Sequence, residues 1–200
     1  MKIRAAVLTG TIVLATLATS SHAEAPCNII KDDKGDAEVL TSSDDAMDIV
    51  SADLAANGKE VAAVIRVVKL KKTTDQSPFG IALTMLWTAP GFDKPLFMRG
   101  TTTVGGADTL KYGYQDGNRL ISLGDAIGTF DLDKSELRIS TFTKNFAAQA
   151  KLASADKLTA VTAEGAAIYG SPAAATLSLA ADSAAAKAPV VVGTESCILK

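Results

Sequence analysis

Residues 47–67 read MDIVSADLAANGKEVAAVIRV, two apolar runs on either side of Asn57 and Gly58. Apolar residues recur at every second position in both runs, a period that is typical of β-strands with one buried face. An Asn-Gly pair between alternating apolar runs is a strong signal of a β-hairpin. Pairing the runs about this turn predicts three pairs with all six side chains in the core: Leu54 with Val61, Ala52 with Ala63, and Val50 with Ile65.

The alternation continues at residues 79–88, which read FGIALTMLWT. Every second residue from Phe79 to Trp87 is large and apolar, whereas most of the residues between them are small or hydroxylated. This pattern favours a place for Trp87 in the core over a ligand-binding role. Further segments with strand character follow, separated by glycine-rich turns: 96–104, 110–114, 120–123, 127–132, 136–142, 158–163 and 190–192.

Short strands and turns at this spacing predict an all-β fold, a single antiparallel β-sandwich of about nine or ten strands with jelly-roll or immunoglobulin-like topology. Two segments are less regular. Residues 144–152 carry helix-forming residues after a candidate cap at Asn145, which predicts one or two helical turns. The alanine-rich segment 173–188 is predicted to be a strand followed by a loop.

The first 23 residues have the organisation of a secretory signal peptide. Lys2 and Arg4 form a basic start, and the apolar stretch 5–18 is short for a membrane span. Small residues predict cleavage after Ala23, with cleavage after Ala25 as the alternative. The mature chain is then expected to be a single secreted domain of residues 24–200 with no integral membrane segment. It is expected either free outside the cell or associated with the cell wall.

Cleavage at either position removes His22, the only histidine of the chain. Histidine is the usual proton carrier near neutral pH and a common metal ligand, so its loss disfavours serine and cysteine triads, zinc sites and histidine-ligated haem. The mature charge is −4, from 18 basic and 22 acidic residues. With no basic stripe, nucleic acid is not an expected partner. We expect a non-catalytic binding protein, with a histidine-independent hydrolase that uses two carboxylates as the enzyme alternative.

Two cysteines, Cys27 and Cys197, lie near opposite ends of the mature chain. In an oxidising compartment an even pair is most simply one disulfide, which would bring the two ends of the domain together. Two free thiols are the alternative.

Three aspartates, Asp32, Asp33 and Asp36, surround Gly35. Several carboxylates in one tight turn suit Ca²⁺, which takes six to eight oxygen ligands in a tolerant geometry. Asp182 joins this candidate site if a disulfide brings the ends of the chain together. The alternative is a solvated Asp-Gly turn. A second acidic run is predicted to be a solvated loop: Asp44, Asp45 and Asp48.

Tyr112 and Tyr114 alternate just before the Asp116–Gly117 turn and point to the same side of their strand. An exposed tyrosine pair is able to stack a sugar, so these residues are the candidate site for a glycan or wall polymer. Cross-strand packing is the alternative. A bare apolar patch or a free strand edge would instead favour a protein partner at the cell surface. The protein is expected to be a monomer.

The order of these features resembles that of small secreted actinobacterial-type proteins and, more distantly, of DOMON-like and family 9 carbohydrate-binding-module-like β-sandwiches. The resemblance implies an extracellular sandwich. Some DOMON-type domains bind haem through methionine and histidine, and this chain offers only methionines. The resemblance depends on these residues: Asp32, Asp33, Gly35, Asp36, Asp48–Asp53, Asn57, Gly58, Gly128, Phe130, Asp131, Leu137–Ile139, Asp182, Ser183, Ala184, Val190–Gly193 and Cys197.

Overall fold

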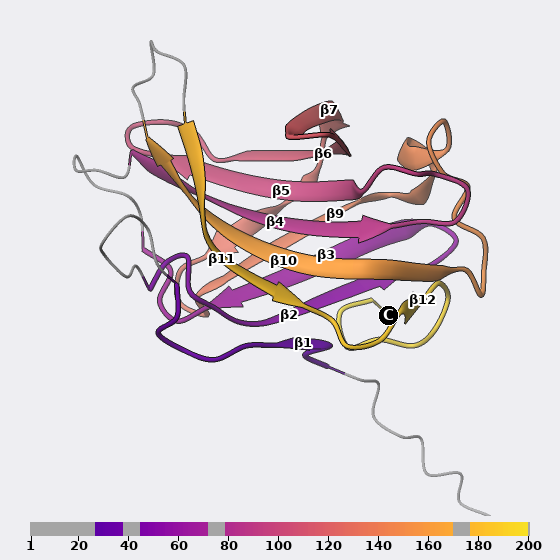
Figure 1. The fold of residues 1–200 in the computed structure, drawn as a ribbon, viewed down its shortest axis with the longest axis horizontal. Coiled ribbons are helices and arrows are strands. Elements are labelled where there is room, and N and C mark those ends of the chain that lie inside the picture. Colours follow the sequence, from indigo (N-terminus) through magenta and orange to yellow (C-terminus); the bar gives the residue numbers. More distant parts are fainter. Residues whose placement is uncertain (1–26, 38–44, 72–78, 170–176, 200) are drawn as a thin grey trace, which may run out of the picture.

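The computed structural model describes residues 27–37, 45–71, 79–169 and 177–199, which form two antiparallel β-sheets packed face to face (Figure 1). The predicted leader and both predicted cleavage positions lie outside the described residues. The all-β sandwich is confirmed, with twelve strands in the described part of the chain where about nine or ten were expected. No helix among the described residues is long and apolar enough to cross a membrane.

Five strands form the first sheet, and the strands at its two edges are β1 and β8. Their order across this sheet is β1 (Ile30–Lys31), β2 (Ile49–Ala56), β3 (Glu60–Val67), β9 (Glu136–Phe142) and β8 (Ile127–Asp131).

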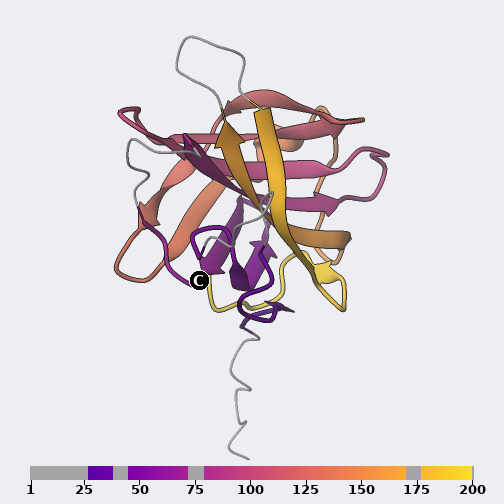
Figure 2. The same ribbon diagram turned by 60° about the vertical axis from the view of Figure 1, so that its left-hand side comes forward.

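Seven strands form the second sheet, in which β4 to β7 are consecutive neighbours. Ala126 alone separates the edge strand of this sheet, β7, from the edge strand β8 of the first sheet. In both ribbon views β10 and β11 lie side by side (Figure 2). The order is β11 (Leu177–Ala185), β10 (Lys157–Tyr169), β4 (Gly80–Thr88), β5 (Leu96–Thr103), β6 (Thr109–Asp116) and β7 (Arg119–Asp125), and β12 (Val190–Val191) pairs with β10.

The β2–β3 hairpin forms around Asn57, but its predicted register is wrong by two residues. The structure pairs Ala56 with Val61, Leu54 with Ala63 and Ala52 with Ile65. The Asn57 side chain explains the tighter turn, because its Oδ1 accepts hydrogen bonds from the backbone N–H groups of Lys59 and Glu60 at 2.8 Å. A shift of two residues keeps the same side chains on the core side.

Val50 is the exception to this rule. An irregularity in the pairing between Ile49 and Ser51 breaks the alternation of β2. Ile49 is fully buried in the core, whereas Val50 is half-buried and lies outside the core cluster. A β-bulge of this kind turns a side chain away from the core, although a strict period of two would place it inside.

The core lies between the two sheets, where β2 faces β10, β3 faces β4, and β9 faces β5. Alternate residues of β4 fill its centre, and Trp87 is fully buried there as the alternation predicts. The predicted helical turn is present only as a 3-10 helix, η1, at Thr143–Phe146. Asn145 does not cap it, because it lies inside the turn and donates to the Thr141 hydroxyl at 2.8 Å.

Candidate functional site

Three of the predicted calcium ligands come together at one end of the sandwich. Carboxylate oxygens of Asp32 and Asp36, in the loop after β1, and of Asp182, on β11, all lie within 4.8 Å of one another. Gly35 adopts a φ of +88°, a conformation that favours glycine, and so shapes the loop between the two aspartates. Asp33 does not join the cluster; it is exposed, and its backbone N–H donates to Asp32 Oδ1.

Burial and the neighbouring carboxylates both raise the pKa values of Asp32 and Asp182. Burial raises the pKa of Asp182, and the charges of Asp32 and Asp36 raise it further. Burial likewise raises the pKa of Asp32, with added contributions from Asp36, Asp33 and Asp48, while the Asp33 N–H lowers it. The charged forms of these carboxyl groups therefore repel one another, and a cation would relieve the repulsion.

Asp48 is the residue that the sequence analysis missed. It was predicted to lie in a solvated loop with Asp44 and Asp45, but it is only 3% exposed. Asp45 is exposed as expected, and Asp44 lies outside the described residues. A signal was present in the sequence, because Asp48 stands directly before a strand and between two apolar residues.

The predicted disulfide joins Cys27 to Cys197, with Cα atoms 5.7 Å apart. Beside it, the N-terminal segment is held to the outer face of the first sheet by Asp53, whose Oδ1 accepts from the Ile29 N–H at 3.2 Å. The other oxygen of Asp53 accepts from Arg66 at 2.8 Å. Arg66 also contacts Glu136 at 3.5 Å, so two almost fully buried carboxylates share one guanidinium.

The two candidate tyrosines are not exposed together. Tyr112 is only 9% exposed and meets Phe146 edge-to-face, with ring centroids 5.3 Å apart. Tyr114 is half-buried and meets Phe92 edge-to-face, while the Lys94 ammonium lies 5.6 Å from its ring centroid. The pair therefore takes part in packing and does not form an open stacking platform.

An exposed apolar surface is present on the outer side of the first sheet. Ile127 on β8 is 65% exposed and Phe142 on β9 is 52% exposed. Ile127 pairs with Ser140, so Phe142 is its diagonal neighbour on the same side of the sheet. We call this surface the β8 face. Its members are Ile127, Phe142, Ser140, Ala62 and Val64.

A groove of about 470 Å³ runs along the β8 face. Small residues of β3, β8 and β9 form part of its lining, and the C-terminal segment lies along it at Ile198 and Leu199. In the described part of the chain β8 pairs only with β9, so its other edge is free. Glu60 and Arg138 also line this groove, so its lining is mixed. The structure therefore combines a free strand edge with exposed apolar side chains and a groove of mixed polarity.

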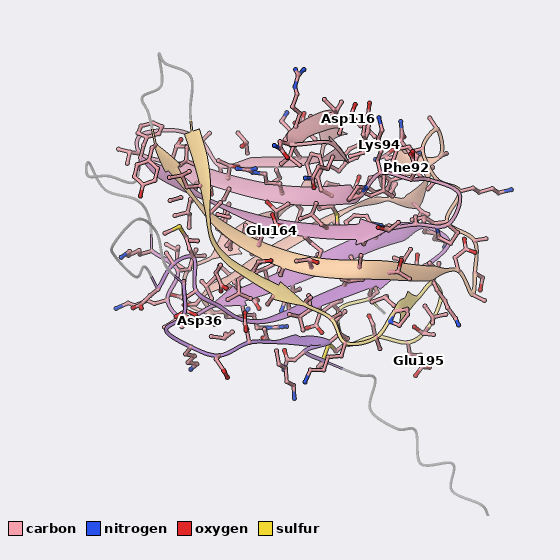
Figure 3. The ribbon with its side chains drawn as sticks, viewed as in Figure 1. Asp36, Phe92, Lys94, Asp116, Glu164 and Glu195 are labelled. Carbon is pink, nitrogen blue, oxygen red and sulfur yellow. A yellow bond between two sulfur atoms is a disulfide. The ribbon has the colours of Figure 1, made fainter. Side chains whose placement is uncertain are left out.

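The outer side of the second sheet carries a line of polar side chains, which we call the polar row. Glu164, Thr84, Arg99 and Lys111 occupy successive paired positions on β10, β4, β5 and β6. Glu164, labelled in Figure 3, is half-buried on β10. Burial raises the pKa of Glu164 and lowers the pKa of Arg99, and the opposite charge of each partner offsets part of this effect.

The fold and these sites define a disulfide-closed β-sandwich with an acidic cluster at one end and two candidate binding surfaces. No protein-family model matches the chain, and no curated protein matches it either. The resemblance to DOMON-like and carbohydrate-module-like sandwiches therefore stays a prediction.

Proposed function

We propose that this chain is a secreted, non-catalytic binding module that recognises a protein partner at the cell surface through the β8 face. The observation that carries this proposal is the pair of exposed apolar side chains, Ile127 and Phe142, at neighbouring positions beside a free strand edge. Apolar side chains that gather around a groove are typical of protein-binding surfaces. The disulfide supports an oxidising, extracellular location.

The edge of β8 suits the addition of a strand from a partner. Its sequence is IGTFD, with no lysine or proline and with a charge only at Asp131. Proteins commonly use charges and prolines to protect edges from pairing. A partner segment in extended conformation would pair its backbone with β8 and place alternate side chains beside Ile127 and the groove. We therefore expect a partner segment that is apolar at every second residue.

A glycan or wall polymer is the second candidate ligand, and the polar row favours it. The tyrosine pair no longer supports this candidate, because Tyr112 packs in the core. The polar row offers instead the carboxylate of Glu164 on β10, the guanidinium of Arg99 on β5 and the ammonium of Lys111 on β6, the last of which also pairs with Asp125. Hydrogen bonds to charged groups are stronger than those between neutral groups. Sugar hydroxyls and anionic wall polymers both suit such groups.

One binding experiment separates the two candidates. Fluorescently labelled protein would be titrated onto isolated cell walls, before and after the walls are treated with protease. Ile127→Ser combined with Phe142→Ser tests the β8 face, and Lys111→Gln tests the polar row. Leu132→Ser is the matched control, because Leu132 is 40% exposed and lies outside the groove of the β8 face.

We expect protease treatment of the walls to abolish binding and the double serine variant to weaken it at least about tenfold, as for the central apolar residues of an interface. Leu132→Ser and Lys111→Gln should bind like the wild type. Binding that survives protease and the double serine variant, but is lost in Lys111→Gln, would contradict the protein proposal and favour a glycan.

A further inference from the structure

Asp48 lies between the loop that carries Asp32 and Asp36 and the strand that carries Asp182. Its Oδ2 accepts a hydrogen bond from the Gly35 N–H at 2.6 Å, so the carboxylate points into that loop. The next backbone N–H, that of Ile49, donates to Asp182 Oδ2 at 2.7 Å. One short segment thus contacts both sides of the acidic cluster.

Within the part of the chain that the structure describes, the second carboxylate oxygen of Asp48 has no hydrogen-bond partner, although the residue is only 3% exposed. A buried carboxylate oxygen without a partner is costly, because it has lost water and gained nothing in return. Asp48 is not one of the three residues whose carboxylate oxygens lie within 4.8 Å of one another, but its side chain contacts the loop that carries two of them. An oxygen without a partner at this place is a suitable donor for a hard cation, since hard cations prefer oxygen ligands.

Gly165 explains how Asp48 comes so close to β11. A Cβ atom at Gly165 would collide with the backbone carbonyl of Met47, so the segment before β2 lies directly against β10 at this point. Gly165 pairs with Asp182 across the β10–β11 ladder. Because Gly165 has no side chain, Met47 and Asp48 are able to approach the β10–β11 pair that carries Asp182.

We propose that Asp32, Asp36, Asp48 and Asp182 hold one Ca²⁺ ion at this end of the sandwich. The ion would join the β1–β2 loop of the first sheet to the edge strand β11 of the second sheet. Four carboxylates from three parts of the chain suit Ca²⁺ better than Mg²⁺, which demands a strict octahedral geometry and keeps most of its waters. The proposed ligand set differs from the one expected from the sequence in one residue, because Asp48 takes the place of Asp33.

The test uses calcium chloride alone as the probe, with the full mature chain. Isothermal titration should give a dissociation constant between about 10⁻⁴ and 10⁻³ M, the range of extracellular modules. At a hundredfold excess over this constant, the melting temperature should rise by about 5–10 °C relative to protein in chelator. Magnesium chloride at the same concentration should produce a much smaller rise.

Asp36→Asn is the first variant, because Asp36 is exposed and its change should leave the fold intact. It should weaken calcium binding at least about tenfold, and Asp48→Asn should do the same. Asp33→Asn is the matched control, with the same charge change in the same loop, and should keep the wild-type response. No calcium-dependent shift in the wild type, or a full shift in folded Asp36→Asn, would overturn the proposal.

Discussion

Phe146 is the residue whose removal should most clearly expose how the sandwich is closed. It is fully buried at the end of η1 and meets Trp87 edge-to-face, with ring centroids 5.6 Å apart and planes at 83°. On its other side it meets Tyr112 at 5.3 Å and 76°. The ring therefore joins the 3-10 turn to β4 and β6 of the second sheet.

We expect Phe146→Ala to lower the free energy of unfolding by about 3–5 kcal/mol, the usual cost of deleting a buried phenylalanine. About 0.5–1.5 kcal/mol of this should come from each edge-to-face pair. For a domain of this size the loss corresponds to a fall of roughly 6–20 °C in melting temperature. Phe142→Ala, four residues earlier and 52% exposed, should change stability by less than about 1 kcal/mol.

Urea unfolding followed by tryptophan fluorescence is the suitable assay, because Trp87 is the only tryptophan. Circular dichroism should follow the same transition, since Phe146→Ala also alters the surroundings of the indole ring. A double-mutant cycle of Phe146→Leu and Tyr112→Leu isolates their pair, with an expected coupling of about 0.5–1.5 kcal/mol. A loss below about 1 kcal/mol in Phe146→Ala would refute the view that η1 closes the core through this ring.

Arg66→Met should cost about 3 kcal/mol in urea unfolding, because it leaves the buried carboxylate of Asp53 without its cation, whereas Glu136 keeps its 2.6 Å ion pair with Arg138; a loss below about 1 kcal/mol would contradict this account. Gly113→Ala should cost about 1–3 kcal/mol, since the added Cβ would collide with the Ile121 carbonyl, whereas Gly58→Ala, with open space around it, should be almost neutral. Glu164 has a pKa raised above its ordinary value of 4.5, so its folded form binds the proton more tightly and its contribution to stability falls as pH rises through that window. The stability of Glu164→Gln relative to wild type should therefore improve between pH 4 and pH 7, and a pH-independent difference in melting temperature would contradict the assignment.

The alternating patterns predicted the layers of the fold well, because a period of two places side chains on one face without any tertiary information. The β4 strand shows this clearly, because its alternate residues from Ile81 to Trp87 lie in the core cluster as expected, although the residues between them are buried as well. The register of the first hairpin failed for a local reason. The Asn57 side chain bonds two backbone N–H groups, and composition alone does not show where such a turn closes.

The acidic cluster was predictable only in part. The turn around Gly35 and the expectation of a disulfide were enough to associate Asp32 and Asp36 with Asp182. The apolar neighbours of Asp48 indicate that it is buried, but they do not place it beside the cluster, because its position depends on the Gly35 loop and on the close approach at Gly165. Contacts of this kind are set by tertiary packing, which a linear pattern does not contain.

The contacts that hold the terminal segments, compared with the unpaired strand edges, are consistent with a partner at the β8 face. The disulfide and the Asp53 carboxylate, which bonds both Ile29 and Arg66, hold the terminal segments beside β1 and β2. Among the described residues β8 pairs along one edge only, and the C-terminal segment at Cys197, Ile198 and Leu199 lines the groove beside it. Leu123 and Ile127, two of the exposed large apolar residues, lie on the edge strands β7 and β8. Exposed apolar side chains on an unprotected edge are an aggregation hazard, so their presence is best explained if a partner covers them.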